Sequence, residues 1–115
     1  MRPDVLRVVQ AYIGAVRVND PAALPLHPQV VFESPLNSIR GAAEFRTALA
    51  PFVRMLRGIE VEHLTADDST CAAVLALETV FGRVPFVEFF EVRDGSIVAI
   101  RAYHDPPPML AGAPR

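Results

Sequence analysis

Apolar side chains near the N-terminus recur every three or four residues, which is the spacing of one face of an amphipathic helix. Asp4 stands at the start of this stripe and is expected to act as the N-cap of the helix. Asn19-Asp20-Pro21 ends the pattern, and the next segment has room for only one more turn before Pro25. We therefore predict a helix over residues 5–16. Its apolar stripe consists of Val5, Leu6, Val8, Val9, Tyr12, Ile13 and Val16.

A second helical pattern begins after Gly41 and ends at Gly58. Pro51 lies inside it, and because proline has no backbone N–H it cannot bond to the carbonyl oxygen of Thr47. We therefore expect a kink or a break in the helix at this position. The apolar face of this segment consists of Phe45, Leu49, Phe52, Val53 and Leu56.

Strand patterns occupy the rest of the chain. Residues 29–33 are rich in β-branched and aromatic side chains, and Ser34-Pro35 closes this short strand. After residue 58 apolar and polar residues alternate, and turn-forming residues divide this half into four segments. Because short turns join these segments, we expect them to pair in sequence order as an antiparallel meander. The four predicted strands cover residues 59–63, 71–81, 84–92 and 97–104.

These elements predict an α+β fold, in which a curled antiparallel sheet wraps around two or three helices from the N-terminal half of the chain. A length of 115 residues, with 51% hydrophobic and 21% charged residues, fits one globular domain. We place this domain at residues 1–105. The Pro-rich segment 106–115 is expected to be an extended tail.

Charge and composition narrow the classes of function. The net charge of -2, without a cluster of basic residues, does not provide the positive surface that binds a nucleic acid backbone. No segment approaches the ~18 apolar residues of a membrane span, and no signal-peptide core precedes Asp4, so we expect a cytoplasmic protein. The lone Cys71 lies in an apolar run and is expected to be buried. His27, His63 and His104 lack metal-ligand spacing, and we expect neither a metal nor a cofactor.

Alternation along the last two strands places one carboxyl and one imidazole on the predicted inner face. If both inner rows face one cavity, Glu88 and His104 are cross-strand neighbours. Aromatic neighbours should raise the pKa of the Glu88 carboxyl by excluding water, whereas the imidazole would oppose that rise. The pair is either a titratable site for acid–base chemistry or a satisfied polar pair, with His104 at the wet end of its strand. The inner rows are Phe86, Glu88, Phe90, Val92 and Val98, Ile100, Ala102, His104.

The opposite face of the predicted sheet carries more apolar side chains than water alone would favour. By strand parity these outer residues are Val87, Phe89, Ala99 and Tyr103. An apolar outer face of this kind is typical of an interface. We therefore expect a homodimer that forms through the outer face of the sheet.

Four segments, taken in order, resemble one known superfamily. They are V-Q-A-Y-I-G-A-V, N-D-P-A-A-L, V-V-F-E-S-P-L-N followed by G-A-A-E-F, and V-E-F-F-E-V-R-D-G-S-I-V-A-I-R-A-Y-H-D. Their order is similar to that of the nuclear transport factor 2-like proteins, and within them to the ketosteroid isomerases and SnoaL-like polyketide cyclases. The resemblance covers about residues 5–105 and implies a cone with a deep apolar cavity open at one end. It does not imply one activity, because this fold hosts isomerases, cyclases, dehydratases, epoxide hydrolases and carriers.

The resemblance to ketosteroid isomerases also implies roles for three positions. Those enzymes use a tyrosine, a protonated aspartic acid and a second aspartate that acts as the base. The tyrosine corresponds to Tyr12, the protonated acid to Glu88, and the base to Ser34. A serine hydroxyl cannot carry a proton between carbons unless a neighbouring group deprotonates it, and Glu33 should point to the other side of the strand. Steroid isomerisation by that mechanism is therefore disfavoured.

Two classes of function follow. The first is a cofactor-free isomerase, cyclase or lyase for an apolar carbonyl compound or polyketide, with Glu88 and His104 exchanging protons and Tyr12 donating to an oxyanion. The second is a non-catalytic module for an apolar ligand or for dimerisation, in which Tyr12 is a core residue and Ser34 and Asn37 only form a turn. The residues expected to contact a ligand are Phe32, Ser34, Asn37, Phe52, Phe86, Phe90, Ile100 and Ala102.

Two further groups of charged residues bear on catalysis. An epoxide hydrolase would need an inward Asp-Arg-Asp group, and strand parity predicts none. Arg101 and Asp105 resemble the R-x-Y-x-D ending of SnoaL-like proteins, but parity places both on the outer face or the rim. We expect them to form a structural ion pair.

Overall fold

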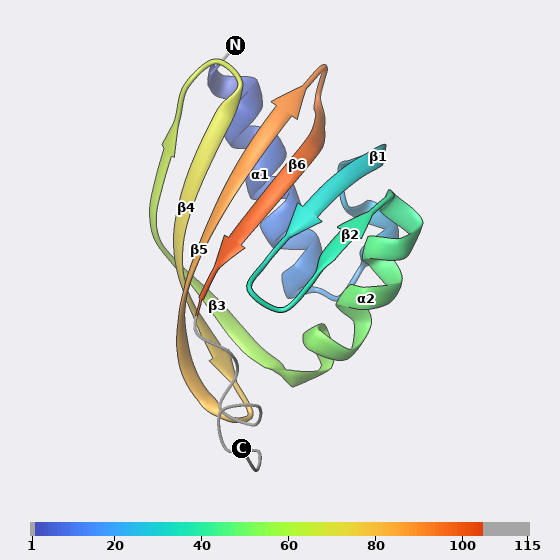
Figure 1. Cartoon of the computed structure of the whole chain (residues 1–115). Coiled ribbons are helices and arrows are strands. Elements are labelled where there is room, and N and C mark those ends of the chain that lie inside the picture. The colour runs from blue at the N-terminus through green and yellow to red at the C-terminus, as the bar shows by residue number, and fades with distance from the viewer. Residues whose placement is uncertain (1, 105–115) are drawn as a thin grey trace.

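Two helices lie on the concave side of one strongly curved sheet in the computed structural model, which describes residues 2–104 (Figure 1). The predicted α+β class, with a curled sheet wrapped around the helices, is confirmed. The predicted tail at 106–115 lies outside the described residues. The elements are α1 (Arg2–Arg17), η1 (Pro21–Ala23), β1 (Leu26–Glu33), β2 (Ser38–Arg40), α2 (Ala42–Met55), β3 (Leu56–Ala66), β4 (Thr70–Thr79), β5 (Gly82–Arg93) and β6 (Ser96–Tyr103).

The sheet has the strand order β2-β1-β6-β5-β4-β3. Strands β3 to β6 form the predicted antiparallel meander. The pairing of β1 with β6 is parallel, with Phe32 opposite Ile100, so the sheet is mixed rather than wholly antiparallel. The prediction also lacked β2, a short strand that pairs antiparallel with β1. Parallel neighbours need a long connection, and here α2 and four strands supply it.

Helix boundaries differ from the prediction at two places. Helix α1 begins at Arg2, so Asp4 lies in the first turn, where its carboxylate faces the positive end of the helix dipole, and not at the N-cap. Helix α2 continues through Pro51 without a break and ends at Met55, because Leu56 adopts an extended backbone. The predicted end at Gly58 was therefore too late. Within residues 2–104 neither helix is long and apolar enough to cross a bilayer.

The narrow end of the concave space is filled by side chains from α1 and the sheet. Val9, Phe90 and Ile97 are all fully buried there. In β6 the register shifts, because Ala99 pairs with Glu91 while Ile97 pairs with Val92, so Val98 has no partner across the strand. This bulge turns Ile97 inward in the place that alternation had assigned to Val98.

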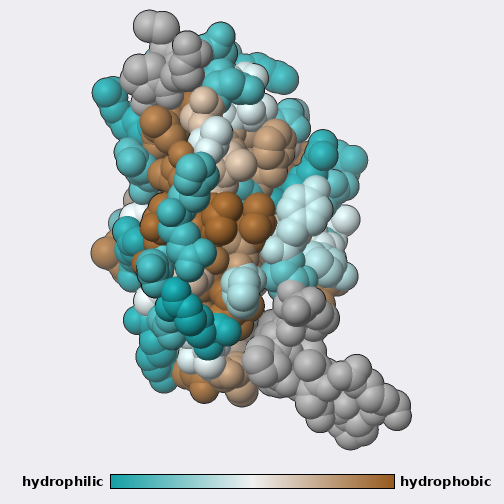
Figure 2. All heavy atoms as spheres, turned by 90° about the vertical axis from the view of Figure 1, so that its left-hand side faces the viewer, coloured by the Kyte–Doolittle hydropathy of each residue, from teal (hydrophilic) through white to brown (hydrophobic). Residues whose placement is uncertain are grey.

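The convex face of the sheet carries an apolar patch with polar groups around it (Figure 2). Val87 and Tyr103 lie opposite each other on β5 and β6 and are 36% and 54% exposed. Phe89 and Ala99 are half-buried on the same strands. The outward positions predicted for these residues are therefore confirmed, and the homodimer through this face stays a prediction.

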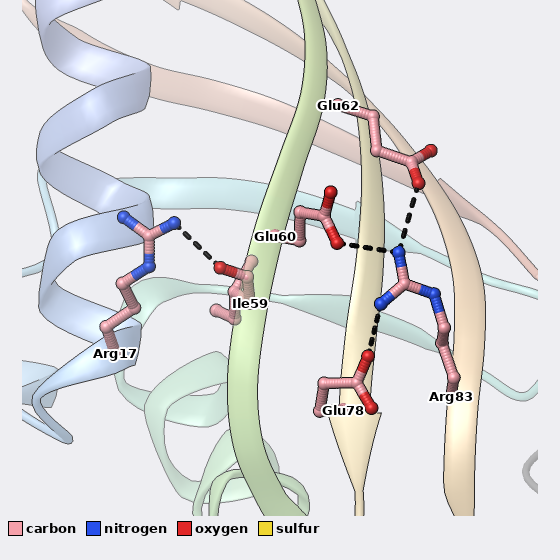
Figure 3. A network of polar contacts seen from close by, with 6 residues as sticks. All are labelled: Arg17, Ile59, Glu60, Glu62, Glu78 and Arg83. Carbon is pink, nitrogen blue, oxygen red and sulfur yellow. Dashed lines mark hydrogen bonds and ion pairs between the residues drawn. The ribbon is translucent and has the colours of Figure 1, made fainter.

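Elsewhere on the sheet, one arginine joins three strands (Figure 3). The Arg83 guanidinium on β5 lies 2.6 Å from a carboxylate oxygen of Glu60 and 3.3 Å from one of Glu62, both on β3. It also donates to Glu78 on β4. These side chains are about half exposed, so water screens the network and its contribution to stability is small.

Candidate functional site

An apolar cavity of about 270 Å³ lies between the concave face of the sheet and the two helices. The polar residues that line it are Tyr12, Ser34, Asn37, Glu88 and His104. All the remaining lining residues are apolar. A largely apolar hollow with a few convergent polar groups is the usual form of a small-molecule site. All five polar residues were predicted from the sequence.

Glu88 is the buried acidic residue of the described chain, with 7% of its surface exposed. It stands in the middle of β5, between Ala73 on β4 and Ala102 on β6. These small neighbours leave room for the carboxyl group, but they offer it no charge. Burial raises the pKa of Glu88 to about 8, so the carboxyl is mostly protonated at neutral pH and can donate a hydrogen bond.

The depth of Glu88 follows from its neighbours on β5. Phe86, two residues before Glu88, lines the cavity. Phe90, two residues after Glu88, is fully buried and does not line it. Glu88 therefore lies at the blind end. Tyr12 of α1 lies at a similar depth, since its ring meets that of Phe90 edge-on with 5.3 Å between centroids. Burial, and to a lesser degree the charge of Glu88, raise the pKa of the Tyr12 phenol well above its usual value, so it remains a donor.

His104 lies nearer the mouth of the cavity. Its ring stacks on Phe86 with 4.5 Å between centroids. The residue directly opposite Glu88 on β6 is Ala102, so His104 is the diagonal cross-strand neighbour of Glu88. Diagonal neighbours on a sheet are ~7–8 Å apart, which is within reach of long side chains, so the two groups face the same part of the cavity.

Ser34 and Asn37 lie in the loop between β1 and β2. The Ser34 hydroxyl donates to the side-chain oxygen of Asn37 at 3.2 Å and accepts from the backbone N–H of Leu36 at 3.1 Å. It also accepts from the N–H of Asn37 at 3.3 Å. These bonds give Ser34 the turn-forming role that the sequence left open, although both residues also line the cavity.

The apolar residues predicted to contact a ligand fall into two groups. Phe32, Phe52 and Phe86 line the cavity. The predicted contacts Phe90, Ile100 and Ala102 do not line it. Phe90 and Ile100 pair with each other in the packed layer beyond Glu88, and the short side chain of Ala102, opposite Glu88, is buried in the core. Alternation correctly turned them inward, but it contains no information on depth along the cone.

Several lining residues were not predicted. Leu36 and Ile39 come from the β1–β2 hairpin, which the sequence reading did not recognise. Met55 closes α2 at the mouth. A short strand after the Ser-Pro turn was the available signal for the hairpin, since Ser38-Ile39-Arg40 alternates polar and apolar residues.

Other sequence features lie away from the cavity. Arg101 is exposed and lies 3.8 Å from Glu91, so its ion partner is on β5, while Asp105 lies outside the described residues. Cys71 is buried, as predicted. Between residues 2 and 104 no three His, Cys, Asp or Glu side chains are arranged to hold a metal ion.

Comparisons with known proteins agree with this geometry. The family model of the SnoaL-like domain matches residues 9–100. A protein from Kribbella flavida DSM 17836 has a TM-score of 0.88 and 29% identity, over 93% of this chain and 91% of that one. A candidate ketosteroid isomerase from the same organism has a TM-score of 0.77 and 21% identity, over 99% and 90%.

A third structure introduces a different chemistry. The LEH-like epoxide hydrolase of M. tuberculosis has a TM-score of 0.76 and 26% identity, over 90% of this chain and 84% of that one. No curated protein sequence matched the chain. Similar folds thus accompany different activities, and the residues of the cavity have to decide between them.

Proposed function

Since the chain belongs to the SnoaL-like domain family, we propose that it is a cofactor-free isomerase, cyclase or lyase that applies acid–base chemistry to an apolar carbonyl compound. The observation that supports this best is the buried carboxyl of Glu88 at the blind end of an apolar cavity. Tyr12 and His104 share the same lining. The carbonyl group of such a substrate matches the polar end of this cavity, and its apolar body matches the apolar lining.

The carbonyl oxygen of the substrate binds at the blind end, where Glu88 and Tyr12 donate hydrogen bonds to it. Negative charge develops on this oxygen when a neighbouring carbon loses a proton. Two donors that are already held in place in an apolar cavity stabilise that charge without reorganising. The raised pKa of Glu88 keeps its proton available for this purpose near neutral pH.

His104 is the base in this proposal. Its imidazole takes a proton from the carbon next to the carbonyl, and the electron pair of that C–H bond forms a C=C bond while Glu88 protonates the oxygen. Return of the proton to another carbon gives an isomer, whereas loss of a leaving group gives a lyase product. Both groups line the same cavity as diagonal neighbours, which supports their action on one bound ligand.

Epoxide hydrolysis fits the cavity less well. Among the described residues that line it, Glu88 is the carboxylate, and no arginine is present. The Asp-Arg-Asp group that such a reaction would need has no counterpart there. The isomerase mechanism with an aspartate base is also disfavoured, because Ser34 stands at that position with its hydroxyl bonded within its own loop.

A second candidate is a carrier of an apolar carbonyl ligand without catalysis. The bonded hydroxyl of Ser34 favours it, since the position of the base in the resembling isomerases then has only a structural role. A carrier would hold the ligand in the same cavity and leave it unchanged.

Proton exchange separates the two candidates. A ketone that raises the melting temperature is incubated with the protein in D₂O, and NMR follows deuterium entering next to the carbonyl. We expect exchange by the wild type and a loss of at least ~100-fold for both Glu88→Gln and His104→Gln. Glu91→Gln, on the outer side of the same strand, is the matched control and should retain the full rate. Binding without exchange would establish the carrier instead.

A further inference from the structure

A small recess lies next to the cavity, beside the β4–β5 hairpin. This recess, of about 20 Å³, shares with the cavity the side chains of Phe52, Met55, Leu77, Phe86 and His104. Its remaining lining residues are Thr79, Phe81 and Val84. The shared side chains, His104 among them, therefore lie between the cavity and the recess and contribute to both.

The tip of this hairpin is apolar and fixed in position. Turn tips usually carry polar residues or glycine, but here Val80 and Phe81 are 46% and 43% exposed. The N–H of Val80 donates to the carbonyl oxygen of Met55 at 2.9 Å, which ties the turn to the end of α2. The Thr79 hydroxyl accepts from the N–H of Phe81 at 3.0 Å and donates to the carbonyl of Gly82 at 2.8 Å.

These bonds leave the side chain of Phe81 without a role in the turn. Thr79 supplies the side-chain bonds, and Gly82 adopts the positive φ of 116° that the turn requires. Phe81 instead lines the recess, whereas Val80 does not. The two neighbouring residues at the tip are thus equal in exposure and different in their relation to the cavity.

The size of the cavity limits what it can enclose. At about 270 Å³ it lies just below the ~300–1,000 Å³ typical of pockets that bury a drug-sized ligand. A compact ketone fits inside it. A longer one with its carbonyl at Glu88 extends beyond the cavity, and the adjacent recess, which Phe86 and Phe81 line, offers apolar surface to its chain.

We propose that the ligand is an elongated amphiphile, with its carbonyl at Glu88 and an unbranched apolar chain that leaves through the recess and lies on Phe81. The carbonyl end of this assignment rests on the proposed function. The chain end rests on the recess and on Phe81, whose ring is partly exposed and whose backbone is held by the bonds of the turn. Phe81 would then determine which chain lengths are accepted.

Straight-chain methyl ketones of increasing length, measured by isothermal titration calorimetry, test this inference. For the wild type we expect the Kd to fall about fourfold with each added methylene that reaches an apolar surface, including those beyond the length that fills the cavity. For Phe81→Ser we expect the longest ketone to bind roughly tenfold more weakly, with a smaller effect on the shortest. Val80→Ser is the matched control and should bind all of them like the wild type.

Adamantyl methyl ketone, a compact probe, completes the experiment. A Kd that stops falling once the cavity is full, or equal losses for Phe81→Ser and Val80→Ser, would overturn the assignment of the chain. Chain-length dependence without deuterium exchange would keep this ligand class and reject catalysis. Exchange of the compact ketone without chain-length dependence would support catalysis and reject the elongated ligand.

Discussion

Two groups of glutamates on the same sheet experience opposite environments. Glu88, on the concave side, is buried, and this burial raises its pKa to about 8. Glu60, Glu62 and Glu78 surround Arg83 in contact with water. The first carboxyl costs stability once it ionises, while the second group is stabilised a little by being charged. Identical side chains thus become a chemical group or a solvated surface, according to what surrounds them.

The largest expected effect is the dependence of stability on pH. The pKa of Glu88 rises from 4.5 to about 8 on folding, so the folded state binds the proton more tightly than the unfolded state. The cost is absent below pH ~4.5, grows as pH rises and is complete above pH ~8, with an upper limit of roughly 5 kcal/mol. Urea unfolding across this range should therefore show Glu88→Gln gaining stability over the wild type as pH increases. A constant difference between the two proteins would contradict the burial of Glu88.

The second effect concerns the rate of proton exchange. If the protonated form of Glu88 is the active one, the rate for a bound ketone should fall as pH rises through about 8. Glu88→Gln should lose about 100-fold at neutral pH and also lose this pH dependence. NMR in buffered D₂O measures both quantities. A wild-type rate that rises through the same range would make Glu88 the base and not the acid.

The outer face of the sheet provides a third test. Val87→Asp places a charge in the apolar patch opposite Tyr103, and in a homodimer formed there it should weaken association by about 2 kcal/mol or more. Analytical ultracentrifugation would then show a shift toward monomer. Val18→Asp changes an exposed apolar residue just after α1 and serves as the control. A wild type that sediments as a monomer would reject the predicted dimer.

The smallest effect is expected for the solvated group. Arg83→Ala removes the partner of three carboxylates, yet it should lower the free energy of unfolding only slightly, because water screens the exposed charges. The loss should shrink as salt is added, because ions screen exposed charges. Arg54→Ala, at the exposed end of α2, provides the comparison. A loss as large as that expected for ionised Glu88 would show that water screens this network far less than its exposure implies.

Most of the fold could be predicted because periodicity reports which side chains face the core. The helices and the meander of β3 to β6 follow from spacings of three to four residues and of two. The parallel partner of β1 could not be predicted, since no local signal connects Phe32 with Ile100. The position of the Val98 bulge was also missed, because an extra residue in one strand leaves no mark on composition.

The site was predictable in its polar groups and not in its shape. Parity and the family resemblance together selected Glu88, Tyr12 and His104, all of which line the cavity. Phe86 and Phe90 share one residue type and one row, but only Phe86 reaches the cavity, because depth depends on how the whole sheet curves. Phe81 was taken as the end of a strand, and its place beside Met55 is visible only in three dimensions.

The parallel pairing of β1 with β6 has a consequence for how the chain is made. Phe32 and Ile100 are 68 positions apart, so β1 leaves the ribosome long before its principal neighbour exists. Until β6 arrives, only the three residues of β2 can pair with β1, and the apolar lining made by β1 and α2 stays open to solvent. Contacts between such distant segments slow folding and prolong the exposure of apolar surface that is prone to aggregation. Newly synthesised chains therefore depend on the last strand to protect the first.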